Sequence, residues 1–315
     1  MRRQSGPIEA LVEASLAYNC PQQGDWFDEE GHLVCGTCGE RKTADKVLPG
    51  VSELEIEGHV TRVGVACRCI REKTAREREL DRKKEHRELV EKILREGMAD
   101  NAYRSMVFER DDDPDSENSR SVHAYIDAWQ EVRKNNLGML LHGGVGTGKT
   151  FYACCVANAL AEQELGVLVA TTPELISRMT GFSGAREETV AHIQRVSLLV
   201  LDDFGAERNT EFSVEQMFSI LDARYRSGKP LIVTTNLSER EMNTMQDPRY
   251  QRICDRILEM CPIRLLVSGK SRRQSGYNAR RDLAREILQR ALKEREERER
   301  AAKQNQANPS QPEQI

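Results

Sequence analysis

Short apolar runs alternate with longer polar, helix-forming stretches between residues 121 and 267. The runs are rich in Val, Leu and Ile and are shorter than ordinary helices, so they predict buried strands of a parallel sheet. The predicted strands are 139–141, 167–171, 197–201, 231–236 and 262–267, and the predicted helices are 121–132, 151–160, 173–180, 187–194 and 211–227. This alternation predicts an α/β fold in which helices flank a parallel sheet.

The two ends of the chain lack this alternation. Residues 71–96 are almost entirely charged, in alternating sign, which predicts a helix that is polar nearly all round. Such a helix is either a rigid arm to a protein partner or a solvated linker. A last helix is predicted at 280–302, and the Gln-, Asn- and Pro-rich segment 303–315 is predicted to be disordered. The predicted domains are 1–70, a charged linker at 71–96, a large domain at 97–280, and a C-terminal helix and tail at 281–315.

Composition narrows the function classes. Apolar residues make up 38% of the chain and charged residues 31%, and no apolar run approaches the roughly 20 residues needed to cross a bilayer. The first residues lead into no long apolar core, so we expect no secretory signal, no membrane partner and a cytoplasmic location. With a net charge of −4, the chain has no overall positive field that would hold duplex DNA. Any contact with nucleic acid must be local, and weak contact with single-stranded DNA fits better than tight binding of a duplex.

A glycine-rich loop lies between the strand at 139–141 and the helix at 151–160. It fits the phosphate-binding pattern G-x-x-x-x-G-K-[ST]. Its glycines let backbone N–H groups turn toward a triphosphate, and the helix start adds favourable partial charge. Lys149 is expected to neutralise β- and γ-phosphate oxygens, and the Thr150 hydroxyl to complete a Mg²⁺ shell. The predicted nucleotide contacts are Gly143, Gly144, Val145, Gly146, Thr147, Gly148, Lys149 and Thr150.

Polar residues end the two strands that follow. The strand at 197–201 delivers Asp202 and Asp203 to the carboxyl edge of the sheet, where α/β proteins bind ligands. Asp202 is expected to hold Mg²⁺ through water, and Asp203 to orient or polarise the attacking water. Asn236 ends the next strand, and its amide is interpreted as a contact to the γ-phosphate or to that water.

Three arginines share one face of a predicted helix, because Arg249, Arg252 and Arg256 are spaced i, i+3 and i+7. Arg249 is interpreted as a solvated residue with local ion pairs to Asp255 and Glu259. Arg252 and Arg256 are interpreted as cations that project across a subunit interface toward a neighbour's γ-phosphate.

Nine cysteines are unevenly distributed along the chain, and five of them lie in its first 69 residues. A C-x-x-C pair, Cys35 and Cys38, precedes a tighter C-x-C pair, Cys67 and Cys69. Four thiolates suffice for a closed tetrahedral Zn²⁺ site, which can hold together a domain too small for its own core. Cys20 is a possible substitute ligand, and the alternative interpretation is a set of free buried thiols.

Residues 97–280 resemble the AAA+ ATPases of the helicase-loader group, the DnaC-like replication proteins, with the transposition helper IstB as close kin. The resemblance rests on 143–150, 198–205 (LLVLDDFG), 231–236 (LIVTTN), 252–258 and 269–273, which occur in the order of the family. It implies an AAA+ P-loop NTPase domain. The cysteine-bearing N-terminal region and the charged helix after it resemble the zinc-containing N-terminal domain of phage and Gram-positive-type loaders.

The resemblance implies roles for single residues of the nucleotide site. Lys149, Thr150 and Asp202 would bind MgATP, and Asn236 would sense the γ-phosphate. Many AAA+ proteins carry Glu where this chain has Asp203. The shorter side chain reaches less far, so slow hydrolysis is expected.

The resemblance also assigns three basic residues and implies self-association through the AAA+ domain. Arg256 would be the arginine finger, with Arg252 supporting it. Arg273 would be the second sensor, although the Ser-Arg-Arg turn leaves Arg272 as an alternative.

The function expected from the resemblance is ATP-dependent loading of the replicative helicase during initiation of DNA replication. The N-terminal domain would grip a DnaB-type helicase, and the ATPase domain would meet single-stranded DNA. Two alternatives stay open: a transposition helper ATPase, and a nucleotide-gated binding adaptor that hydrolyses little or nothing.

Overall fold

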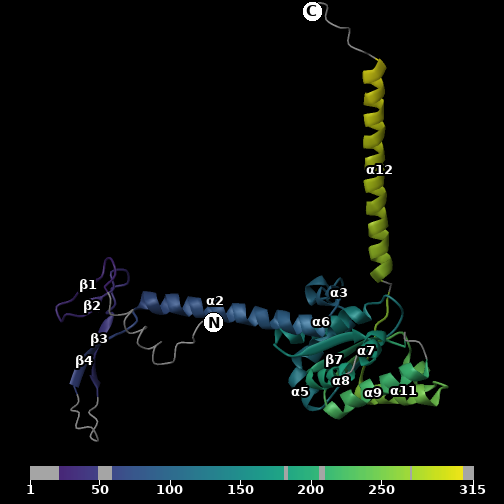
Figure 1. Ribbon diagram of the computed structural model, residues 1–315, viewed down its shortest axis with the longest axis horizontal. Helices are drawn as coiled ribbons and strands as arrows, with labels where there is room; N and C mark the ends of the chain where they lie inside the picture. The colour runs from purple at the N-terminus through teal and green to yellow at the C-terminus, as the bar shows by residue number, and fades with distance from the viewer. Residues whose placement is uncertain (1–20, 49–58, 181–183, 206–209, 270–271, 308–315) are drawn as a thin grey trace, which may run out of the picture. The chain divides into compact units, whose positions relative to one another are not determined.

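The computed structural model (Figure 1) describes residues 21–48, 59–180, 184–205, 210–269 and 272–307. The chain forms two compact units, which we call the N-terminal unit (1–88) and the C-terminal unit (89–315). The boundary falls inside the charged helix α2 (Arg68–Gly97), which covers the predicted helix at 71–96. The finer division of the chain into a linker and a C-terminal tail stays a prediction.

A five-stranded parallel sheet forms the centre of the C-terminal unit. Its strand order is β6-β7-β8-β5-β9, and every neighbouring pair is parallel. The strands are β5 (Met139–His142), β6 (Val167–Thr171), β7 (Leu198–Phe204), β8 (Leu231–Thr235) and β9 (Ile263–Leu266). All five predicted strands are confirmed, with small shifts at their ends.

Alternating residues of each strand enter two separate cores, because successive side chains of a strand point to opposite faces. In β7, Leu199 and Leu201 lie in one core, and Leu198 and Val200 lie in the other. Both faces are therefore apolar, which explains why the strand sequences are continuous apolar runs rather than alternating ones.

Helices cover both faces of the sheet. The first core contains residues of α7 (Thr172–Met179), α8 (Ala185–Arg195), α9 (Glu211–Ser227) and α11 (Pro248–Met260). The second contains residues of α4 (Glu117–Asp127), α5 (Trp129–Lys134) and α6 (Lys149–Glu162). Shorter helices are α3 (Asn101–Arg104), α10 (Glu239–Asn243) and the 3-10 helix η2 (Phe108–Arg110). The result is the predicted α/β architecture.

Two helix predictions need correction. The helix expected at 121–132 is two helices, because Ala128 between them has φ −86° and ψ 13°, which interrupts the helix. The last helix, α12 (Arg272–Ala307), extends beyond the predicted 280–302 at both ends. Residues 303–307, predicted to be disordered, are therefore helical, which agrees with the high helix propensity of Ala, Lys and Gln. Residues 308–315 lie outside the described residues.

The N-terminal unit has two small antiparallel sheets. One pairs β1 (Trp26–Phe27) with β2 (Leu33–Val34), and the other pairs β3 (Thr43–Leu48) with β4 (His59–Gly64). Trp26 and Phe27 are exposed, whereas Leu33 and Val34 are buried.

In the described part of the chain, no helix has the length and apolar character that a membrane span requires.

Candidate nucleotide site and candidate metal centre

The glycine-rich loop connects β5 to α6, as predicted, and its conformation needs glycine. Gly143, Gly146 and Gly148 have φ values of 143°, 79° and 108°, which side chains disfavour. A Cβ on Gly143 would also come within 2.3 Å of the Val267 carbonyl oxygen. The loop therefore adopts this backbone conformation without strain only when these positions are glycine.

Lys149 is the first residue of α6 and is buried between the loop and the end of β8. Its Nζ donates to the carbonyl oxygens of Gly143 (3.0 Å) and Gly144 (2.7 Å) and to Asn236 Oδ1 (2.8 Å). Residues from two distant segments thus converge on one ammonium group. A phosphate oxygen at this place would compete with Asn236 for the charge of Lys149.

Asp202, in the second half of β7, is the acidic centre of the site and only 5% exposed. Its Oδ1 accepts from the hydroxyls of Thr150 (2.9 Å) and Thr234 (2.6 Å), and its Oδ2 accepts from Tyr103 (3.2 Å). A hydroxyl that donates its proton keeps its oxygen lone pairs. The Thr150 oxygen and the Asp202 carboxylate thus form an oxygen donor set of the kind that Mg²⁺ prefers.

Burial, followed by the negative charge of Asp202, raises the pKa of the Tyr103 phenol. Tyr103 therefore remains a hydrogen-bond donor to the carboxylate at physiological pH. The backbone of this segment is held by Asn158 of α6, whose Nδ2 donates to the carbonyl oxygens of Tyr103 (2.9 Å) and Met106 (2.8 Å). Sequence motifs did not indicate this contact, because Tyr103 lies outside every recognised pattern.

Asp203 is exposed and has a left-handed backbone conformation, with φ 58°. Its N–H donates to the Thr234 hydroxyl at 2.9 Å. Its side chain lines a cleft of about 390 Å³, a volume in the range of small-molecule sites. The other lining residues are Met106, Arg110, Asp112, Val145, Gly146, Gly148, Lys149, Thr150, Phe151 and Asn236. Residues of the loop at 143–150 and Asp203 therefore line one cleft, and Asp202 adjoins it through its hydrogen bond with Thr150.

The structure distinguishes the three arginines of α11. Arg256 Nη1 contacts Asp222 Oδ1 at 2.8 Å, and its guanidinium lies 5.0 Å and 4.9 Å from the ring centroids of Phe218 and Tyr225. Arg252 is exposed, and within the described chain no hydrogen bond or ion pair joins it to another residue.

Arg249 forms ion pairs as expected, but with other partners. It contacts Glu211 (2.8 Å) and Asp247 (3.4 Å) rather than Asp255 and Glu259. Helix spacing considers only neighbours on the same helix, whereas Glu211 belongs to α9. Arg272 begins α12, and its side chain and that of Arg273 lie outside the described residues, so the second sensor stays a prediction.

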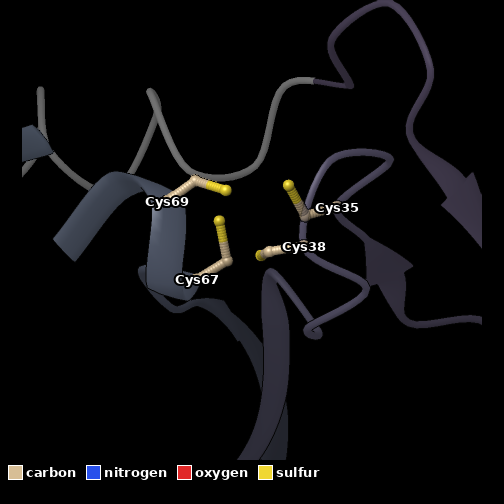
Figure 2. Close-up of side chains that lie close together, drawn as sticks. All are labelled: Cys35, Cys38, Cys67 and Cys69. Atoms are coloured by element: carbon tan, nitrogen blue, oxygen red, sulfur yellow. The ribbon is translucent and has the colours of Figure 1, made fainter. Parts of the chain in front are cut away.

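Four cysteine thiols form a cluster in the N-terminal unit. The sulfur atoms of Cys35, Cys38, Cys67 and Cys69 all lie within 4.8 Å of one another, and Figure 2 shows them pointing toward a common centre. A tetrahedral Zn²⁺ with Zn–S bonds of about 2.3 Å keeps its sulfurs about 3.8 Å apart. The cluster could therefore hold a metal ion. Cys20 lies outside the described residues.

Backbone amides and mutual repulsion set the charge of this cluster. The N–H groups of Cys69 and Glu40 lower the pKa of the Cys38 thiol to about 6. The hydrogen bond with Cys38, together with burial, raises the pKa of Cys69 to about 12. One of the four thiols is thus readily deprotonated. The other thiols lose their protons together with it only when a cation is bound.

An ion pair and hydrogen bonds to the backbone hold the segments that carry the cysteines. Asp25 and Lys42 are both buried, with 2.6 Å between Oδ2 and Nζ, and Asp25 Oδ1 accepts the Gly36 N–H at 3.0 Å. The hydrogen bond from Lys42, followed by those from backbone amides, lowers the pKa of Asp25 to about 2. Glu40 accepts the N–H of Arg68 at 2.7 Å. These contacts tie the loop of the first cysteine pair to the start of α2.

The sheet order, the phosphate loop and the acidic strand end define a P-loop nucleotide-binding protein of the AAA+ type. The chain belongs to the family of IstB-like ATP-binding proteins, whose model matches residues 71–279. The resemblance to the DnaC/IstB-like group of AAA+ ATPases is thereby confirmed.

Similar curated proteins include helicase loaders and an insertion-sequence protein. The replicative helicase loader DnaI of Bacillus subtilis (strain 168) is 28% identical over 165 residues, 48% of this chain and 52% of the relative. The loader DnaC of Escherichia coli (strain K12) is 28% identical over 132 residues, 41% and 53% of the two chains. A putative ATP-binding protein in an insertion sequence of Mycobacterium tuberculosis is 31% identical over 114 residues, 36% and 43%. The chain spans about half the length of the curated relatives it matches.

Solved structures similar to this chain include those of DnaI and DnaC. The crystal structure of DnaI has a TM-score of 0.46 at 23% identity and covers 55% of this chain and 93% of its own. The crystal structure of the DnaC helicase loader has a TM-score of 0.47 at 20% identity and covers 54% and 100%.

Proposed function

We propose that this protein is an ATP-dependent loader of a replicative DNA helicase. One observation carries the ATPase part: Lys149, Thr150 and Asp203 line one cleft, and the Thr150 hydroxyl donates to the buried Asp202, although both aspartates are distant in sequence from the loop. The cleft combines the Lys149 ammonium group, the glycine-rich loop and the Asp203 carboxylate, with Asp202 bonded to Thr150 beside them, and this set matches a triphosphate with its divalent cation.

Each polar side chain has a distinct task in ATP hydrolysis. Lys149 binds the β- and γ-phosphate oxygens, and Asn236 moves from Lys149 to the γ-phosphate or the attacking water. Thr150 and Asp202 would hold Mg²⁺, and the ion would supply positive charge to the phosphates when bound. Asp203 orients and polarises the attacking water from the cleft wall. Because its side chain is short, we propose slow hydrolysis that a partner or single-stranded DNA stimulates.

Arg252 and Arg256 are proposed to act across a subunit interface. Arg256 would first exchange its contacts with Asp222 and two aromatic rings for a neighbour's γ-phosphate, whereas the exposed Arg252 needs no such exchange. Arg252→Ala is therefore expected to lower partner-stimulated turnover without changing the melting temperature. Arg256→Ala is expected to lower both. Equal effects of the two variants on melting temperature would contradict this distinction.

The N-terminal unit favours the loader over the transposition helper. Its cysteine cluster precedes residue 71, where the match to the IstB-like family begins. The resemblance described above implies a zinc-containing domain in this place for loaders, and we take the transposition helpers to lack such a domain usually. We therefore propose that this unit binds a DnaB-type helicase and that the C-terminal unit contacts single-stranded DNA. The insertion-sequence relative keeps the transposition helper as the second candidate.

Loss of the Lys149 charge tests the proposal. Lys149→Ala is expected to weaken ATP binding by about 10- to 100-fold, because a charged hydrogen bond to phosphate is lost, and to abolish helicase loading. Lys134→Ala, which removes an exposed lysine at the end of α5, is the matched control and should retain both.

Two further outcomes separate the candidates. Failure of the unmodified protein to bind any DnaB-type helicase, combined with capture of a transposase, would favour the transposition helper. Nucleotide binding without turnover, with or without single-stranded DNA, would favour a binding adaptor.

A further inference from the structure

A local irregularity between β7 and β8 explains how two consecutive aspartates serve one site. In a regular strand, successive side chains point to opposite faces of the sheet. Here the register shifts: Leu201 pairs with Val233, but Phe204 pairs with Thr235. Two residues of β7, Asp202 and Asp203, thus lie opposite the single residue Thr234, which is the arrangement of a β-bulge.

Thr234 is placed to hold this bulge. Its side chain is fully buried, and its hydroxyl donates to Asp202 Oδ1 at 2.6 Å while accepting the Asp203 N–H at 2.9 Å. One hydroxyl therefore uses its donor and its acceptor capacity on the two acidic residues. The Asp203 amide, which the bulge removes from the strand ladder, obtains its partner in this way, and the left-handed conformation of Asp203 is held.

We propose that Thr234 is a positioning residue of the ATPase site: its hydroxyl holds the Asp202 carboxylate for Mg²⁺ and turns Asp203 toward the cleft. The inference rests on the proposed ATPase function. Thr234 is fully buried and is not among the residues that line the cleft, so it acts through the two aspartates. Residues of this kind typically change metal affinity or activity by about 10- to 100-fold when they are removed.

The neighbouring Thr235 provides a matched control. It is equally buried, and its hydroxyl also donates once and accepts once, to the Phe204 carbonyl oxygen (2.8 Å) and from the Leu237 N–H (3.1 Å). Neither contact involves an aspartate. Thr234→Val and Thr235→Val therefore delete the same group at the same depth, and they differ in whether the acidic pair loses its support.

The experiment measures the Mg²⁺ concentration that gives half-maximal binding of a fluorescent ATP analogue, together with turnover and thermal stability. Thr234→Val is expected to raise that Mg²⁺ concentration by about tenfold or more and to lower turnover at least as much. Its binding of nucleotide in the presence of a chelator should stay within about twofold of the unmodified protein. Thr234→Ser keeps the hydroxyl and should restore the Mg²⁺ requirement to within about threefold.

Thr235→Val is expected to lose thermal stability as Thr234→Val does, with an unchanged Mg²⁺ requirement. If Thr234→Val does not fold, Thr234→Ala compared with Thr234→Ser makes the same test. A Mg²⁺ requirement equal in Thr234→Val and Thr235→Val, or no rescue by serine, would overturn the positioning role alone. Absence of Mg²⁺-dependent nucleotide binding in the unmodified protein would instead overturn the proposed function, and this inference with it.

Discussion

The two units of the chain obtain their cohesion by different means. In the C-terminal unit, the strands and the helices around them bury two large apolar cores. In the described part of the N-terminal unit, the buried apolar residues are Leu33, Val34, Cys35 and Cys67. Polar His32, Lys42 and Thr43 are buried beside them. A core of this size cannot offset the conformational entropy of folding, so the small unit depends on thiolates, ion pairs and, by our proposal, Zn²⁺.

This comparison also indicates which single substitutions should destabilise each unit. Apolar burial is distributed over many residues, so single surface changes in the C-terminal unit matter little. The N-terminal unit concentrates its stability in a few polar contacts, so single changes there have large effects. The predictions below follow this contrast in order of expected size.

Metal removal should separate the two units most strongly. A chelator, or the double change Cys35→Ser and Cys38→Ser, is expected to unfold the N-terminal unit, because a structural Zn²⁺ site contributes about 10–16 kcal/mol in small metal-binding domains. Limited proteolysis should then cleave within 21–70 and leave the C-terminal unit intact, and metal analysis should show the loss of zinc. Zinc retained after both substitutions, or no zinc in the purified protein, would contradict the site.

A buried arginine tests whether the C-terminal unit relies on apolar contacts alone. Arg224 is fully buried, and its guanidinium donates to the carbonyl oxygens of Ile193, Val196, Ser197 and Pro230. Burial lowers the pKa of Arg224. Arg224→Met leaves these four acceptors without a donor and is expected to lower the free energy of unfolding by about 3 kcal/mol or more.

The control for Arg224→Met is Arg226→Met. Arg226 lies on the same helix, is exposed and pairs with Asp222. Its substitution should change the free energy of unfolding by less than about 1 kcal/mol. Denaturant titration of both variants measures the difference. Similar losses would show that Arg224 contributes no more than an exposed helix residue.

The buried Asp25–Lys42 pair should be the polar counterpart in the N-terminal unit. Asp25→Asn leaves the Lys42 charge buried without a carboxylate and is expected to cost about 3–5 kcal/mol, whereas adding Lys42→Met should recover most of the loss. Thermal denaturation of the metal-loaded protein measures both. A double variant no more stable than the single one would contradict this interpretation.

The pH dependence of that loss follows from the sign of the pKa shift. The folded pKa of Asp25 is lowered from 3.8 to about 2, so its contribution is complete above the unfolded value and is lost as the pH falls through about 2. The stability difference between the unmodified protein and Asp25→Asn should therefore be the same at about pH 8 and about pH 6. A difference that shrinks over this interval would assign the effect to another group.

Two adjacent threonines at the start of α7 provide the smallest effects. The Thr172 hydroxyl is buried without a hydrogen-bond partner among the described residues, whereas the Thr171 hydroxyl caps the helix by accepting the Glu174 N–H at 3.3 Å. Thr172→Val should raise the free energy of unfolding by about 0.5–1 kcal/mol, and Thr171→Val should lower it by about 1 kcal/mol. Calorimetry of the pair measures two opposite shifts in melting temperature, and equal shifts would contradict the assignment.

Much of the candidate site was predictable because its signals are local. The phosphate loop needs glycines at fixed offsets from Lys149. A buried strand that carries aspartates after its apolar residues can be recognised from seven consecutive residues, Leu198–Phe204. The cysteine cluster was predictable from the two close pairs, although their convergence depends on the hairpin β3–β4 between them. The last helix was harder to bound, because a polar helix without apolar periodicity has no clear end.

The amino-acid sequence by itself determined the strands, the order of the motifs and the residue types that a triphosphate and a metal ion require, since each depends on neighbours a few positions away. Only the tertiary structure decided which distant groups meet: Thr234 opposite both aspartates, Tyr103 on Asp202, and Asp222 beneath Arg256. Such contacts depend on strand register and helix packing, which arise from the sum of many weak interactions across the whole core. No local pattern encodes that sum.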